Sequence, residues 1–210
     1  MKLYIHEIFS DSGLVYKIQN KLPWLFQLAE LESFRAGRVG MEVGSIREKI
    51  LIALLIYKFG EENVETEIPI TEPEIDVRLF GNPVSIKTLT GKNLSSVKLI
   101  WTVDAQQARK FSRQYQPGCD MLLVQINWEN KGGLYYFSQE LQLEVLNKLG
   151  KDNYIKLPKA GTNPRGVEIT AKALQTLAQH SRSLHIPIYW SKTIINFQLY
   201  QRWLEYWRQE

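Results

Sequence analysis

The residues with the clearest chemical potential lie in one stretch, residues 74–88, with the sequence EIDVRLFGNPVSIKT. Apolar and polar residues alternate on both sides of its centre, which is the period of a β-strand whose two faces have different surroundings. Gly81 and Asn82 tolerate the positive φ angles of a tight turn. The stretch therefore predicts two strands joined as a hairpin.

This turn determines which residues of the hairpin stand opposite each other. Val77 would pair with Ile86, and Asp76 would stand opposite Lys87. The polar face then carries Asp76, Ser85 and Lys87. A carboxylate, a hydroxyl and an ammonium group on one face can do chemistry, although an Asp–Lys pair across two strands also occurs as a simple ion pair.

Hydrolysis of a phosphodiester matches these residue types. Its transition state gathers negative charge, and the attacking water must be activated; a divalent metal ion held by carboxylates serves both needs. Mg²⁺ prefers one or two carboxylates together with water and phosphate oxygens. Asp76, supported by Glu48, offers such a ligand set, and Lys87 offers a group that orients or deprotonates the water. We therefore expect Mg²⁺ as the cofactor.

The sequence lacks the motifs of several other kinds of site. It has no cluster of Cys and His with the spacing of a zinc site and no GxxxxGK[ST] loop for a nucleotide phosphate. It also has no GxSxG motif around a nucleophilic serine. We therefore expect no nucleotide cofactor.

Glu48 lies near the beginning of a strongly apolar predicted helix. Ser45 and Glu48 have the spacing of a capping box, so the helix is predicted to begin at Ser45 and to end at Gly60. Residues 50–57 are apolar almost all round, which predicts burial. A carboxylate at the head of a buried apolar face needs a partner, either the backbone in a capping box or a cation.

The other elements predict an α/β (α+β) fold in one domain over residues 1–210. Strands over 97–103 and 120–128 flank a helix that Asp104 caps, so we expect them to run parallel as a βαβ unit. The hairpin would belong to a central mixed sheet flanked by helices. The further predicted elements are a helix over 14–34 broken at Pro23, a strand over 134–137, helices over 139–149 and 169–180, and a short strand over 186–190.

The last predicted helix, residues 194–208, carries aromatic residues at helical spacing, among them Tyr200, Trp203 and Trp207. One interpretation is that this helix packs on the core of its own chain. The alternative is a subunit interface, where Trp and Arg are enriched.

Composition sets broad limits on the class of protein. The 210 residues carry a net charge of +4 with a pI near 9.0, which weakly favours an anionic partner. The single Cys119 excludes an internal disulfide and is expected to be a small core residue in a reducing compartment. The sequence has no apolar leader and no stretch of membrane-span length, so we expect a cytoplasmic protein without a membrane partner.

The order of these features resembles the PD-(D/E)xK nuclease superfamily, and within it the type II restriction endonucleases. The resemblance covers residues 45–90 and rests on a helix with Glu48, then Glu74-Ile-Asp76, then Val84-Ser-Ile-Lys87. It implies a restriction-endonuclease-like fold with a catalytic hairpin. It also implies that Asp76 is the main metal ligand, that residue 85 occupies the place of a second ligand, and that Lys87 serves the attacking water.

This sequence departs from the pattern of the superfamily at two positions. Pro73 stands three residues before Asp76 instead of directly before it, and Ser85 replaces an acidic residue. A neutral hydroxyl is a poor Mg²⁺ ligand. Glu48 is therefore expected to supply the second carboxylate, with the backbone carbonyl of Ile86 as a further ligand. Glu74 competes with Glu48 for this role, and Asp104 is a more distant candidate.

The resemblance implies a restriction enzyme that acts as a homodimer on a short palindrome of double-stranded DNA. Two alternatives remain open: a structure-selective repair or junction-resolving nuclease of the same superfamily, and a non-catalytic nucleic-acid-binding protein. The candidate DNA contacts are basic and polar residues of three loops, together with one methionine that would wedge between bases: Arg38, Met41, Lys92, Asn93, Lys98, Lys159, Thr162, Asn163 and Arg165.

Overall fold

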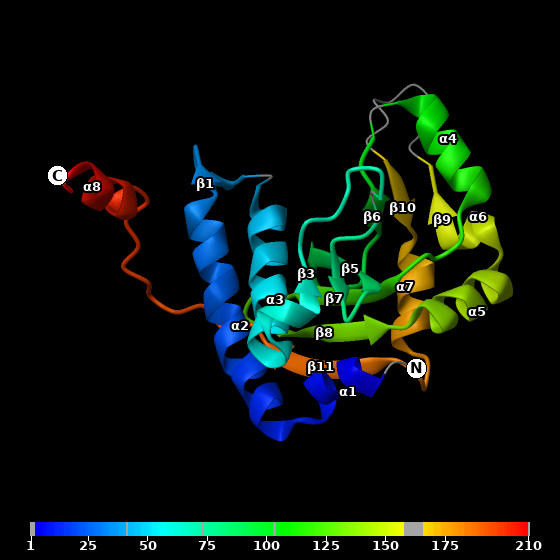
Figure 1. Cartoon of the computed structure of the whole chain (residues 1–210), viewed down its shortest axis with the longest axis horizontal. Coiled ribbons are helices and arrows are strands. Elements are labelled where there is room, and N and C mark those ends of the chain that lie inside the picture. Colours follow the sequence, from blue (N-terminus) through cyan, green and yellow to red (C-terminus); the bar gives the residue numbers. More distant parts are fainter. Residues whose placement is uncertain (1–2, 41, 73, 103, 158–165, 210) are drawn as a thin grey trace.

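A mixed β-sheet forms the centre of the molecule (Figure 1). The computed structural model describes residues 3–40, 42–72, 74–102, 104–157 and 166–209. Six strands follow the order β11-β8-β7-β5-β4-β3, with β5 and β7 parallel and the other neighbours antiparallel, which confirms the predicted mixed sheet. The strands are β3 (Val64–Glu65), β4 (Val77–Leu79), β5 (Asn82–Thr90), β7 (Asp120–Ile126), β8 (Lys131–Phe137) and β11 (Leu184–Tyr189).

The two faces of this sheet pack against two separate groups of helices. One apolar core joins the sheet to α1 (Leu3–Ser10), α2 (Ser12–Glu32) and α3 (Val43–Phe59). The other core contains residues of α4 (Ala105–Gln114), α5 (Gln139–Leu149), α6 (Lys151–Tyr154) and α7 (Ala171–Ala178). Because both faces are covered, β7 is buried along its whole length, and only Asp120 and Gln125 interrupt its apolar sequence.

A second, three-stranded sheet accompanies the group around α4. It has the order β6-β10-β9, with antiparallel pairing of β6 (Val97–Ile100), β10 (Val167–Ile169) and β9 (Ile155–Lys156). The prediction that the strand at 97–103 runs parallel to β7 is therefore wrong. The parallel partner of β7 is the hairpin strand β5. The sequence contains strand, helix and strand in the expected order, but it does not show which earlier strand lies beside β7.

Helix α2 continues through Pro23, although a break was predicted there. A proline in a helix interior removes one backbone hydrogen bond, which costs about 3 kcal/mol in an isolated helix. Pro23 is itself buried, and the helix also buries Leu22 and Phe26 in the first core. Tertiary packing of the apolar face therefore outweighs the local cost.

Helix α3 differs from its prediction at its start and in its burial. It begins at Val43 after Glu42, with no side-chain cap, so Ser45 lies inside the first turn and the predicted capping box is wrong. It ends at Gly60 as predicted. Ala53 and Tyr57 are exposed on one side of the helix, so the helix is buried on its other side only and not almost all round as predicted.

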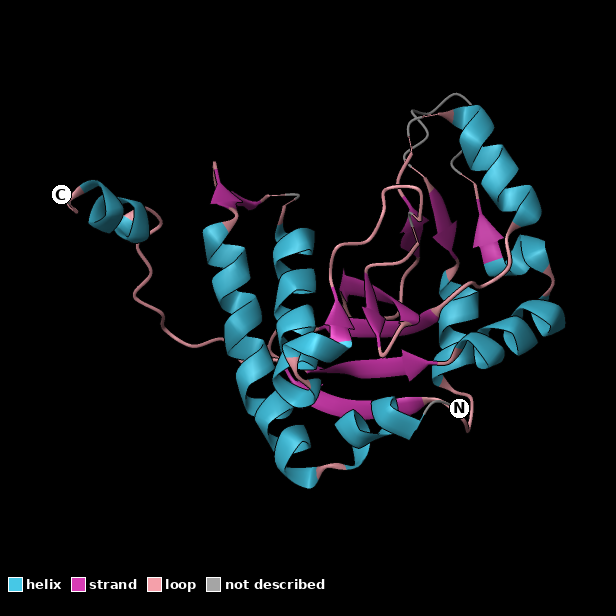
Figure 2. Cartoon of the chain, viewed as in Figure 1, coloured by secondary structure: helices cyan, strands magenta, loops and turns pink. Residues whose placement is uncertain are grey.

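The remaining elements lie beyond the ends of the helix pair α2 and α3. Strands β1 (Phe34–Arg35) and β2 (Arg38–Val39) form a small hairpin after α2, and the 3₁₀ turn η1 (Glu61–Asn63) follows α3 (Figure 1). The chain then ends in a projecting segment with helix α8 (Gln201–Trp207), shorter than the predicted helix over 194–208 (Figure 2). Among the described residues, no helix combines the length and apolar character that a membrane span requires.

Candidate active site

The β4–β5 hairpin turns one residue earlier than predicted. Phe80 and Gly81 have φ angles of 49° and 72°, so these two residues form the tight loop. Val77 pairs with Val84, not with Ile86 as predicted. The pairing moves by two residues, and side chains alternate with a period of two, so the predicted polar face is unchanged.

Asp76 lies directly before β4 and is held against β5. Its backbone N–H donates to the Val84 carbonyl at 3.1 Å. Its Oδ2 atom accepts three hydrogen bonds, from the Ile86 N–H at 2.6 Å, the Lys87 Nζ at 2.9 Å and the Ser85 Oγ at 3.2 Å. The structure thus brings Asp76, Ser85 and Lys87 together around one carboxylate oxygen.

The surroundings of this cluster limit its access to water. Ser85 is fully buried, and the side chains of Asp76 and Lys87 are only 20% and 12% exposed. In a strand, the N–H and the C=O of one residue point to the same side. The Ile86 N–H donates a hydrogen bond to Asp76, so the Ile86 carbonyl is also directed to the side of that carboxylate. Its predicted role as a metal ligand requires this direction.

Glu48 approaches the same cluster from helix α3. Burial and, to a lesser degree, the charge of Asp76 raise the pKa of Glu48 to about 6, against the opposing effect of Lys87. Helix α3 packs against β5, and the charges of both Asp76 and Lys87 act on this carboxylate. In the described structure Glu48 does not take part in a capping box, because α3 begins at Val43, five residues before Glu48.

Glu74 is the second acidic residue near Asp76, and its surroundings are drier. The Tyr115 hydroxyl, at the end of α4, donates to Glu74 Oε1 at 3.3 Å. Burial raises the pKa of Glu74 to about 7, although the Tyr115 hydrogen bond and the Lys87 charge lower it. Cys119 is buried beside the backbone of Glu74, as expected of a core residue, and burial raises the pKa of its thiol.

The charges of this site fit a divalent cation bound by oxygen atoms. Three carboxylates, those of Asp76, Glu48 and Glu74, interact with the single ammonium group of Lys87, and repulsion by Asp76 disfavours ionisation of both glutamates. A bound cation would reverse that effect. In the part of the chain that is described, no three or more Asp, Glu, His or Cys side chains are grouped to hold a metal. The donors suit Mg²⁺, which takes one or two carboxylates and adds water and phosphate oxygens.

Arg47, which sequence reasoning missed, joins α2, α3 and the end of β5. Its guanidinium donates to Glu30 Oε1 at 2.6 Å and to the Thr90 hydroxyl at 3.2 Å, and its side chain is 6% exposed. Glu30 also accepts from the Trp128 indole at 2.8 Å. This buried network fixes the helix that carries Glu48 relative to the strand that carries Lys87. The feature of the sequence that could have indicated this role is an arginine within a predicted apolar helix.

Four of the predicted DNA contacts lie in described segments. Arg38 is exposed on β2, Lys92 and Asn93 are exposed in the loop after β5, and the Lys98 ammonium lies 3.6 Å from the centre of the Trp101 ring. Met41, Lys159, Thr162, Asn163 and Arg165 lie outside the described residues. Asp104 caps α4 by accepting from the N–H groups of residues 106 and 107, and so it has a structural role.

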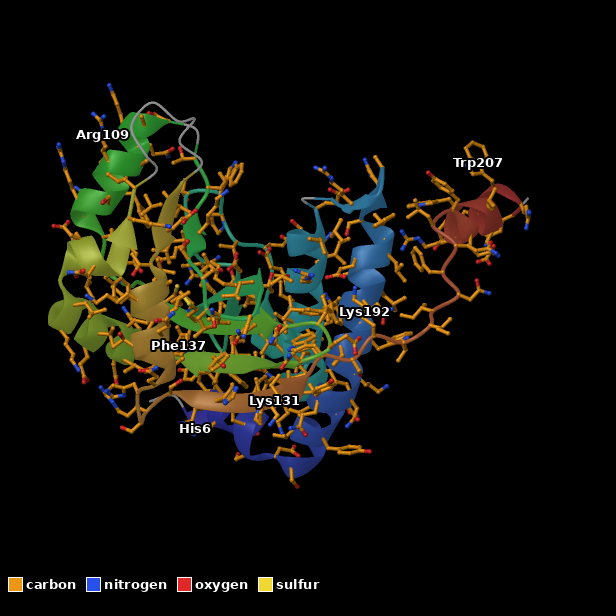
Figure 3. All side chains as sticks on the ribbon, turned by 180° about the vertical axis from the view of Figure 1, so that it is seen from behind. His6, Arg109, Lys131, Phe137, Lys192 and Trp207 are labelled. Carbon is orange, nitrogen blue, oxygen red and sulfur yellow. The ribbon has the colours of Figure 1, made fainter. Side chains whose placement is uncertain are left out.

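Helix α4 adds a basic surface that the sequence analysis did not single out. Arg109, Lys110 and Arg113 are exposed along it, and Arg109 points outward in Figure 3. Lys110 also lines a pocket that reaches Glu74. The positive charges beside the carboxylate cluster favour a phosphate-bearing ligand.

Comparison with known proteins shows the family of this chain. The family model described as "Restriction endonuclease ThaI" matches residues 8–209. A solved structure described as "Restriction endonuclease in complex with substrate DNA" is 54% identical in sequence. The match covers 97% of this chain and 98% of that chain, with a TM-score of 0.91. A search of curated proteins found no match. The chain therefore belongs to the ThaI family of restriction endonucleases.

Proposed function

We propose that this site-specific deoxyribonuclease cuts both strands of a short palindromic DNA sequence as a Mg²⁺-dependent homodimer, with residues 1–210 as one nuclease domain. The observation that carries the proposal is the meeting of Asp76, Lys87 and Glu48 at the hairpin, because this supplies both an oxygen-rich cation site and a cationic group for the water. The solved relative was described with its substrate DNA.

Each residue of the cluster has a distinct proposed role. Asp76 is the central metal ligand, and its Oδ2 is oriented by the Ile86 N–H and the Ser85 hydroxyl. The Ile86 carbonyl and the Glu48 carboxylate complete the protein ligands, with Glu74 as the competing second carboxylate. Mg²⁺ bound there would stabilise the negative charge of the phosphodiester transition state. Ser85 positions Asp76 and is not itself a ligand.

Lys87 acts on the attacking water. Its ammonium group is held 2.9 Å from Asp76 Oδ2, so its position is fixed before substrate binds. A water beside the scissile phosphate would lose its proton to a non-bridging phosphate oxygen of the substrate as it attacks phosphorus, and the lysine would orient that water and stabilise the developing hydroxide. The leaving 3′ oxygen takes a proton from solvent. Low exposure of Lys87 and Asp76 strengthens these interactions.

The DNA itself would be held by basic and polar residues around the cluster. Arg38, Lys92, Asn93 and Lys98 are the proposed contacts among the described residues, and Lys110 extends this set beside Glu74. One chain carries one cluster, and cutting two antiparallel strands at symmetric positions requires two. A two-fold dimer meets that requirement.

A cleavage assay with metal omission tests the proposal. Plasmid and short duplexes would be incubated with the protein, with and without Mg²⁺. We expect discrete fragments that depend on the metal and that disappear with Asp76→Ala and with Lys87→Ala, while Asp152→Ala, an exposed residue of α6, keeps full activity. Fragments that persist in either of the first two variants would contradict the assignment.

A further inference from the structure

The C-terminal arm, residues 191–209, exposes an unusual amount of aromatic surface. Helix α8 has no buried residue, and Trp207 is 88% exposed. Trp203, Leu204 and Tyr206 are each about half exposed. Figure 3 shows Trp207 far from the body of the protein. Exposed apolar side chains gathered in this way mark an interaction surface, since monomeric proteins rarely leave them uncovered.

The arm is fixed mainly at its root, and its helix adds one ion pair. The Thr193 backbone exchanges two hydrogen bonds with the Gln27 side chain, at 2.7 and 2.9 Å. The Lys192 N–H donates to the Glu129 carboxylate at 2.9 Å. Beyond this root, Arg202 reaches Glu32 at 3.7 Å. The root therefore sets the direction in which the arm leaves the sheet, toward the end of α2 and away from both cores (Figure 2).

An apolar groove lies on the outer side of the helix pair α2 and α3. Its floor includes Leu25 from α2 and Ile50, Ala53 and Leu54 from α3, and Lys17 and Lys21 stand at its border. No residue of the described arm lines this groove. Lys17 already lies over the ring of Tyr57, 4.4 Å from its centre. The groove thus offers apolar contact and cations that can stack on aromatic rings.

The arm lies beyond the end of its own groove. Arg202 is beside Glu32, whereas Leu25, the lining residue of the groove nearest to it in the same helix, is seven residues earlier. At 1.5 Å per residue this is a separation of about 10 Å along α2. The segment before α8 leads away from the helix pair (Figure 2), so α8 does not reach the groove of its own chain.

We propose that the arm is exchanged between two copies of this chain, with α8 of each copy bound in the α2–α3 groove of the other. The chemistry of the two surfaces matches. Trp203, Leu204 and Trp207 supply apolar area for the floor, and Glu205, whose carboxylate has no ion pair among the described residues, supplies a charge opposite to Lys17 and Lys21. The inference rests on the proposed homodimer and identifies the surface that forms it.

The size of the contact is sufficient for a stable dimer. A covered tryptophan buries about 150–250 Å², and a two-fold axis repeats the contact. Trp207 and the exposed half of Trp203 on each of two arms, together with the groove surface that they cover, remove on the order of 1,000 Å² from water, which is the area that specific interfaces need. Such an exchange links the two active sites through the helix that carries Glu48.

Cysteine cross-linking between different chains tests the exchange. Leu204→Cys and Ala53→Cys would be prepared as separate proteins, mixed and oxidised; both positions are exposed and the native Cys119 is buried. We expect a disulfide-linked dimer in the mixture. The matched control mixes Leu204→Cys with Lys148→Cys, an exposed residue of α5 on the opposite side, and should give none. A link that forms only inside one chain carrying both cysteines would overturn the proposal.

A second measurement separates this inference from the proposed function. The mass of full-length Trp203→Ala/Trp207→Ala would be followed by analytical ultracentrifugation over a range of concentrations, with circular dichroism to verify folding. We expect the dimer dissociation constant to rise at least tenfold. An unchanged dissociation constant in a protein that still cuts DNA would overturn the arm exchange and leave the nuclease assignment intact. Absence of cleavage by the unmodified protein would instead contradict the proposed function.

Discussion

The hydrogen bond between Tyr115 and Glu74 gives a test of which glutamate completes the metal site. The hydroxyl donates to Glu74 Oε1 at 3.3 Å and lowers the pKa of a carboxyl group that burial raises to about 7. Hydrogen bonds to charged groups contribute about 1.5–3 kcal/mol, and the length of this one places it at the lower end. Since one pKa unit corresponds to about 1.4 kcal/mol, Tyr115→Phe is expected to raise the pKa of Glu74 by about one unit.

The proposed ligand Glu48 predicts a pH profile of cleavage with its limb near 6 that Tyr115→Phe leaves in place, whereas Glu74 in that role would give a shifted profile. If ionised Glu74 binds the cation, kcat/KM at a subsaturating Mg²⁺ concentration falls as pH drops through about 7 in the unmodified protein. In Tyr115→Phe the midpoint moves upward by about one unit. Near pH 7 the ionised fraction then falls from about a half to about a tenth, so the rate decreases about fivefold. At pH 9 the two proteins should have nearly equal rates.

Tyr154→Phe is the matched control for this experiment. Its ring stacks near that of Tyr115 and is equally buried, but its hydroxyl has no hydrogen-bond partner among the described residues. The same loss of a hydroxyl should leave the midpoint in place. A midpoint that stays unchanged in Tyr115→Phe as well, with a limb near pH 6, would refute the role of Glu74 and favour Glu48, whose pKa is about 6.

Three further predictions concern stability and DNA binding. Arg47→Met leaves Glu30 buried without its guanidinium and should lower the free energy of unfolding by about 3 kcal/mol, measured by urea denaturation, whereas adding Glu30→Gln should recover part of this loss. Lys92→Gln should weaken DNA binding and reduce the slope of log K against log salt by about 0.9, since one phosphate contact is lost. Gly166→Ala would place a methyl group 1.8 Å from the Ile100 carbonyl at a φ of 110°, and should destabilise the fold by about 3 kcal/mol or more.

Local patterns in the sequence predicted the elements well where the local signal agrees with the packing. The cap at Asp104 and the end of α3 at Gly60 both depend on hydrogen bonds within a few residues of the chain. The polar face of the hairpin was also predictable, because strand alternation fixes it whatever the pairing. The exact turn was not, since Phe80 adopts a positive φ that its residue type disfavours.

Contacts between distant parts of the chain could not be predicted from the sequence patterns. Pro23 stays helical because α2 packs against the core, and local sequence patterns do not describe that packing. The pairing of β7 with β5 depends on how a long connection returns to the sheet. Tyr115 reaches Glu74 across 41 positions of the chain. The structure brings the predicted hairpin residues together, but the groups that tune their charge became visible only in three dimensions.

The most direct test of the proposed active site is a paired measurement of binding and cutting by Asp76→Asn. The substitution keeps the size of the side chain and one acceptor oxygen but removes the charge that the metal site and Lys87 require. We predict that the variant binds its DNA site within a few-fold of the unmodified protein, in gel shift without metal, and that cleavage with Mg²⁺ falls by about a thousandfold or more. Cleavage at an undiminished rate by Asp76→Asn would contradict the account.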